Sequence, residues 1–140
     1  MITRDDLFTV FRTTDPLFAT LTDGFVAEWS EGPTTANEEG VPHYILAGAI
    51  AEAIVKGLAE RNDDFCERSF AMIERLHVEG DAYVREIATI GLLEAIQGYM
   101  KAEKLKSDSA VHRLGPESRV WWEKLIQFWE QGDASALRYD

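Results

Sequence analysis

The stretch that decides the fold is IERLHVEGDAYVREIATIGLLE, residues 73–94, in which two apolar patterns meet at Gly80 and Asp81. Apolar side chains recur at helical spacing over residues 66–76 and again over residues 84–99. Glycine commonly ends a helix, and an aspartate that follows it caps the start of the next one. The stretch therefore predicts two helices joined by a tight turn, with Asp81 as the N-cap of the second.

The same helical spacing continues on both sides of this hairpin. Asp15-Pro16 is a helix start, because an acidic N-cap followed by proline suits the first turn. Further helices are expected over about 3–12, 16–29, 42–59 and 116–130, and no segment alternates with the period of a strand. We expect a single all-α domain of about six helices, with N-terminal helices and an acidic loop in 1–41 and a helical core in 42–130.

Two resemblances bear on this core. The order Asp81, Val84-Arg85 and Gly91 resembles the second helix of a HEAT-type repeat, which implies either a helical bundle or a short HEAT-like stack. Residues 73–94, together with the Leu114-Gly115-Pro116-Glu117-Ser118 start of a tryptophan-rich helix, resemble an uncharacterised bacterial family of small helical proteins with a domain-of-unknown-function label. That resemblance covers about residues 43–130 and implies no catalytic residues.

Charge and composition limit the classes of function. The chain has 140 residues, 46% of them apolar, and a net charge of −11, of which −6 falls in residues 1–40 (2 basic and 8 acidic side chains). Nucleic acids and anionic membrane surfaces are recognised by Lys and Arg, so this balance disfavours both as partners. A basic protein would instead be attracted electrostatically. The N-terminus is acidic and lacks the apolar segment of a signal peptide, which predicts a cytoplasmic location.

No motif indicates an enzyme, a cofactor or a metal. In His77-x-Glu79-x-Asp81 the first two side chains point to opposite faces of a helix, and Asp81 is needed as a cap. Cys66 lies on an apolar helix face, which indicates packing. Glycines within helical patterns are expected to mark close helix packing. Arg85 is expected to be structural and to pair with a carboxylate.

Two features indicate a protein partner. The loop over residues 30–41 carries Glu31, Glu38 and Glu39 and little apolar content, so it is a candidate electrostatic docking site. Trp121 precedes Trp122, which shares the core stripe with Trp129. Trp121 is therefore expected at a boundary, either packed on a neighbouring helix or partly exposed as an anchor.

We therefore expect a non-enzymatic protein-binding module. Acidic helical proteins of this size loosely resemble immunity proteins that neutralise polymorphic bacterial toxins, which implies a basic toxin domain as the partner. A repeat-like structural or adaptor protein is the alternative. A small hydrolase is a third possibility, and it would require a polar cleft with ionisable groups of perturbed pKa.

Overall fold

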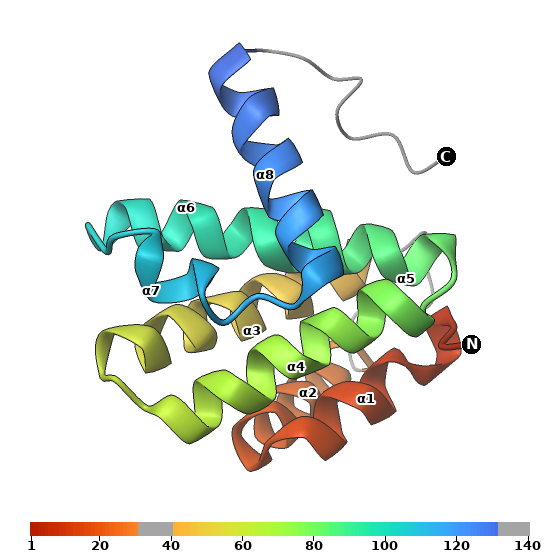
Figure 1. Ribbon diagram of the computed structural model, residues 1–140. Coiled ribbons are helices and arrows are strands. Elements are labelled where there is room, and N and C mark those ends of the chain that lie inside the picture. Colours follow the sequence, from red (N-terminus) through yellow and green to blue (C-terminus); the bar gives the residue numbers. More distant parts are fainter. Residues whose placement is uncertain (31–40, 132–140) are drawn as a thin grey trace.

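The computed structural model describes residues 1–30 and 41–131 (Figure 1). Apart from one isolated β-bridge between Ile2 and Gly80, the described elements are helices. In chain order they are η1 (Arg4–Asp6), α1 (Leu7–Thr14), α2 (Pro16–Ser30), α3 (Val41–Ala59), α4 (Asp63–Glu79), α5 (Ala82–Glu86), η2 (Ile87–Leu93), α6 (Glu94–Ala102), α7 (Asp108–Val111) and α8 (Pro116–Gln131). The all-α prediction is confirmed.

The predicted turn at Gly80 and Asp81 is present. Helix α4 ends at Glu79, and the Asp81 carboxylate accepts a hydrogen bond from the Val84 backbone N–H at 2.9 Å, as an N-cap does. Ile2 adds two backbone hydrogen bonds at this turn. Its N–H donates to the Glu79 carbonyl, and its carbonyl accepts from the Asp81 N–H. The N-terminus of the chain therefore stabilises the turn that the hairpin sequence defines.

Replacing Asp81 by Ala should lower the free energy of unfolding by about 1 kcal/mol, because the cap of α5 loses its side-chain acceptor. Urea unfolding of the wild type and of Asp81→Ala measures the difference. Asp81→Asn should recover most of it, since asparagine also caps helices well. Equal stability of the alanine variant and the wild type would contradict the capping role.

The core is arranged around α3. This helix packs against α2 on one side and against η2 and α6 on the other, while α4 packs along it (Figure 1). Helix α8 contacts α4 and η2 through its first half, with Trp122 and Leu125 buried, and its second half extends away from the other helices (Figure 1). This placement leaves a space between the second half of α8 and α6.

A π-helical segment lies within the rod formed by α5, η2 and α6. Regular α-helical spacing predicts Ala95 and Tyr99 on the buried side, but the structure buries Ile96 and Met100 and leaves Ala95 and Tyr99 half-buried. The π-helical residues Ile87–Leu93 have wider turns than an α-helix, so the faces of α6 are shifted by about one residue. The predicted buried face of α6 is therefore wrong by one position.

Only some of the glycines within helices mark close helix packing. Gly57 and Gly91 do mark close packing, since a Cβ at Gly57 would lie 2.6 Å from the Phe65 ring and one at Gly91 would lie 3.1 Å from Ala47 Cβ. Gly24, Gly48 and Gly98 have no atom within 4 Å of such a Cβ, so close packing does not explain them. The segment over residues 103–114, where no helix was expected, contains the short helix α7. No helix among the described residues is long and apolar enough to span a bilayer.

Candidate functional site

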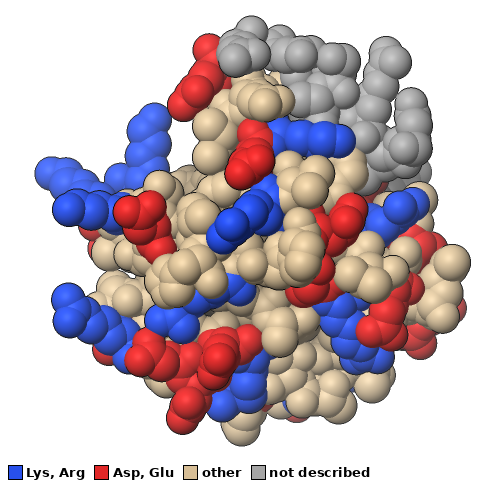
Figure 2. All heavy atoms as spheres, viewed as in Figure 1, with Lys and Arg blue, Asp and Glu red and all other residues tan. Residues whose placement is uncertain are grey.

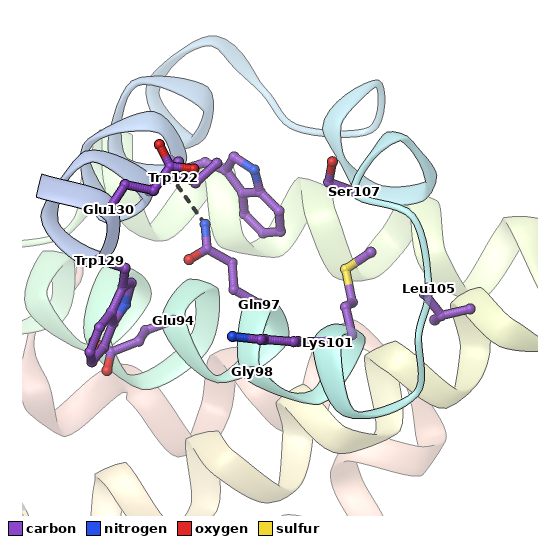
Figure 3. A pocket seen from close by; sticks show the side chains of 11 residues that line it. Glu94, Gln97, Gly98, Lys101, Leu105, Ser107, Trp122, Trp129 and Glu130 are labelled. Atoms are coloured by element: carbon purple, nitrogen blue, oxygen red, sulfur yellow. Dashed lines mark hydrogen bonds between the residues drawn. The ribbon is translucent and has the colours of Figure 1, made fainter.

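A cleft with a volume of about 660 Å³ lies between α6 and α8 and is bounded at one end by the connection from α6 to α7 (Figure 3). One wall is a single face of α6 on which side chains recur every three or four residues: Glu94, Gln97, Gly98 and Lys101. The opposite wall comes from α8: Trp122, Ile126, Trp129 and Glu130. The Gln97 side-chain amide donates to the Trp122 carbonyl oxygen at 3.2 Å and ties the two walls together.

The tryptophan exposed at this cleft is Trp129, not Trp121. Trp121 is only 7% exposed, with Lys124 Nζ 4.4 Å from its ring centre, so the expectation of a partly exposed anchor is corrected in favour of packing. Trp129 was expected in the core stripe with Trp122 and Leu125, yet it is 61% exposed. It shares their angular face of α8 but lies on the half of the helix that extends past its neighbours (Figure 1).

Two polar groups in the cleft lack partners among the described residues. Burial raises the pKa of the Glu94 carboxyl, and no hydrogen bond or ion pair of this side chain offsets that effect. Trp122 is 2% exposed, and its indole N–H is buried without an acceptor. Buried donors are normally satisfied, and an unsatisfied one costs about 1–3 kcal/mol. The cleft therefore offers the Glu94 carboxylate to a ligand, whereas the Trp122 N–H has no accessible surface and is out of a ligand's reach.

Gly98 lies at the middle of the α6 wall, is exposed, and leaves open space where a Cβ would be. Gly98→Ala should raise the free energy of unfolding by about 0.5–1 kcal/mol, because alanine restricts the unfolded chain and suits a helix interior better. Thermal and urea unfolding measure this change. A destabilised Gly98→Ala would mean that the position is not open. If alanine is more stable at this position, the glycine of the wild type is consistent with a surface that contacts a partner.

A second hollow, of about 640 Å³, lies between α2, α3 and α4, and two of its lining residues, Asp15 and Arg68, pair with each other. The Asp15 carboxylate is 7% exposed, accepts from the Arg68 Nε at 3.1 Å, and caps α2 by accepting from the Leu17 N–H at 2.9 Å. These bonds give Asp15 and Arg68 a structural role. The α6–α8 cleft is therefore the stronger candidate site.

His77 and Ser118 form a serine–histidine contact that is enclosed in the core. His77 Nδ1 is 3.0 Å from Ser118 Oγ and its Nε2 is 3.0 Å from Thr89 Oγ1, while the three residues are 3%, 0% and 0% exposed. Burial, only partly opposed by the neighbouring Glu74, lowers the pKa of His77 to about 4. A substrate cannot reach the hydroxyl, so this network joins α4, η2 and α8 and is structural.

The remaining candidate residues have separate environments. Cys66 is fully buried, as expected from its apolar face, and burial raises the pKa of its thiol. Within residues 1–30 and 41–131, no cluster of three or more His, Cys, Asp and Glu side chains is arranged to hold a metal. The pairing expected for Arg85 is not found, because its buried Nε has no partner in the described part of the chain. It does not line the α6–α8 cleft.

The acidic docking loop stays a prediction, because Glu31, Glu38 and Glu39 lie outside the described residues. On the face shown in Figure 2, Lys and Arg side chains lie among Asp and Glu side chains, without one extended patch of a single sign. Attraction of a basic partner would therefore depend on the net charge of −11 and on local groups more than on this face as a whole.

The fold and the cleft define a small all-helical protein with a solvent-exposed tryptophan at a mixed apolar and charged groove. The family described as Domain of unknown function (DUF7674) matches residues 18–130, and the chain belongs to this family. The match takes in α2 as well as the segment from residue 43 onward in which the sequence resemblance was found. No curated protein and no solved structure matches the chain.

Proposed function

We propose that the chain is a non-enzymatic protein-binding module and that a segment of its partner binds in the α6–α8 cleft. The observation that carries the proposal is Trp129, a tryptophan 61% exposed at the edge of a cleft that also contains Ile126 and Met100. Tryptophan is enriched among the residues that contribute most to protein interfaces, and apolar surfaces next to it are buried on binding. A large exposed indole gives the free protein little stability, so a contact with a partner accounts for its place.

The electrostatic environment supports a binding site more than a hydrolytic one. Burial raises the pKa of the Glu94 carboxyl in the cleft, while the serine–histidine contact lies in the core. A hydrolytic site needs a nucleophile and a base within reach of each other and of the substrate. The exposed indole and the open Gly98 surface instead suit the docking of a chain segment.

The test is capture of a partner with a photo-crosslinking amino acid at Lys101, on the α6 wall of the cleft. In cells of the source organism, the crosslinked protein should be lost with Trp129→Ala and with Gly98→Leu, which fills the cleft. Gly24→Leu is the matched control, because Gly24 is also an exposed glycine within a helix with no atom within 4 Å of a Cβ. Crosslinks that survive Trp129→Ala and Gly98→Leu would refute the cleft as the binding site.

Toxin neutralisation is the sharpest form of this proposal, and it is supported by the net charge of −11, which would attract a basic toxin domain. Its test is growth of cells that express the captured partner with and without this protein. Rescue by the wild type and by Gly24→Leu, but not by Gly98→Leu, is the expected result. A captured partner that is harmless to cells would favour the structural or adaptor role.

A further inference from the structure

The inference concerns the chemistry of the segment that binds in the cleft, and it rests on the proposed function. Glu94 and Glu130 line the cleft together with Trp129, and Figure 3 shows these three side chains at the same end of it. Lys101 lies two helical turns along α6 from Glu94, toward the α6–α7 connection. No ion pair between described residues includes Glu94, Glu130 or Lys101. Negative charge therefore predominates beside the exposed indole.

The indole and the two carboxylates are complementary to a cation. The face of an indole attracts a guanidinium or ammonium group, and arginine is favoured because its planar group also stacks on the ring. Carboxylates next to the ring add charge-assisted hydrogen bonds. The raised pKa of Glu94, which has burial as its only cause, agrees with a carboxyl group that lacks a cationic neighbour in the free protein.

The aromatic and aliphatic lining of the cleft suits an apolar segment beside the cation. Trp122 lines the cleft, is 2% exposed, and has an indole N–H without an acceptor in the described part of the chain. In Figure 3 its ring extends from α8 toward the α6–α7 connection, between Gln97 and Ser107. The N–H itself has no accessible surface, so Trp122 contributes its apolar ring to the cleft and not a hydrogen bond. A free amine or a simple metal cation offers no apolar surface to contact this ring.

We propose that the cleft binds an apolar segment of a partner protein that inserts an arginine side chain against Trp129, with the carboxylates of Glu94 and Glu130 as its counter-charges. Apolar side chains beside the arginine contact Ile126 and Met100. The experiment separates this proposal from two alternatives. In one the cleft binds a purely apolar segment, and in the other it binds an acidic segment through Lys101.

The experiment uses the full chain labelled with 5-fluorotryptophan, so that each of its four tryptophans gives a ¹⁹F signal. The probes are the peptide acetyl-Leu-Arg-Leu-Leu-Arg-Leu-amide and the same peptide with glutamine or glutamate in place of both arginines. Trp129→Phe assigns the Trp129 signal. The arginine peptide should shift that signal and bind about 10-fold more tightly than the glutamine peptide, as one stacked and paired cation implies. The glutamate peptide should bind more weakly still.

The variant Glu94→Gln with Glu130→Gln should bind the arginine peptide no more tightly than the glutamine peptide. The control is Glu103→Gln with Glu123→Gln, which removes the same charge from exposed residues of the α6 end and α8 outside the cleft lining. Lowering the pH through the Glu94 pKa should weaken binding of the arginine peptide to the wild type, because protonation removes one counter-charge. In Glu94→Gln this pH-dependent loss of affinity should be absent.

Equal affinity of the arginine and glutamine peptides, preference for the glutamate peptide, no shift at Trp129, or an equal loss in the control variant would each overturn the arginine proposal. These outcomes are distinct from failure of the proposed function. A crosslinked partner that still depends on Trp129 and Gly98, with affinity unchanged by Glu94→Gln and Glu130→Gln, would retain the cleft as a docking site and reject only its recognition of a cation.

Discussion

Replacing Glu74 by Ala is expected to lower the free energy of unfolding by about 2–3 kcal/mol, because helix α8 loses its N-terminal cap. The residue before this helix is Gly115, which has no side chain to act as a cap. Glu74 of α4 acts instead, and its carboxylate accepts from the backbone N–H groups of Glu117 at 3.1 Å and Ser118 at 2.9 Å. Burial alone would raise the Glu74 pKa, but these hydrogen bonds outweigh it and the pKa lies below its usual value.

Gly115 makes this cap possible, because a Cβ there would overlap the Glu74 carboxylate. Gly115→Ala should therefore displace the cap, and its effect should be far from additive with that of Glu74→Ala in urea unfolding. Glu67→Ala is the control, since Glu67 is an exposed acid on the same helix. If Glu74→Ala leaves the protein unfolded, Glu74→Gln, which keeps one acceptor oxygen, should give a smaller loss. A glutamine variant as stable as the wild type, or full additivity with Gly115→Ala, would contradict the cap.

Acidification from pH 7.5 to 4.5 is expected to remove about 2.5 kcal/mol of stability through His77 alone. The folded-state pKa of about 4 lies below the ordinary value of 6.5, so the unfolded chain binds a proton more readily in this window. Stability is fully present above about pH 6.5 and is lost progressively as the pH falls toward 4. The Glu74 carboxylate, with a pKa below its usual value of 4.5, adds its own loss as the pH falls through about 4.5 and below.

Urea unfolding at pH 7.5, 6.0 and 4.5 measures this dependence, and an NMR titration of the His77 ring gives its pKa directly. His77→Gln should be less stable at neutral pH but should lose about 2.5 kcal/mol less on acidification. His112→Gln is the control, because His112 is an exposed histidine directly after α7, where its Nδ1–H donates to the Asp108 carbonyl. An acid loss of the same size in His77→Gln and in the wild type would rule out His77 as its source.

The sequence by itself determined the long helices, since their apolar faces and most of their ends depend on local chemistry. It did not determine α7 or the cap of α8, which Glu74 supplies from α4. The N-cap at Asp81 and the N-cap at Asp15 before Pro16 are where capping side chains predict them. Helix α4 starts at Asp63 as expected, but its cap is Asn62, whose side chain accepts from the Phe65 N–H. Cys66 and Leu92 are buried as the apolar spacing predicts. Capping bonds and helical periodicity involve residues within one or two turns of each other, so a single segment carries the information.

The candidate site was decided by the tertiary structure. The aromatic residues of α8 were recognised as a cluster, but which tryptophan is exposed depends on where the neighbouring helices end, and the sequence of α8 does not contain that information. The α6 wall was missed because the π-helical residues Ile87–Leu93 shift its faces by about one residue relative to the regular helical spacing. The volume between α6 and α8 depends on the angle between them, and contacts of α8 with His77 and Glu74 of α4, about 40 residues earlier in the chain, hold α8 in place. No local pattern records these contacts.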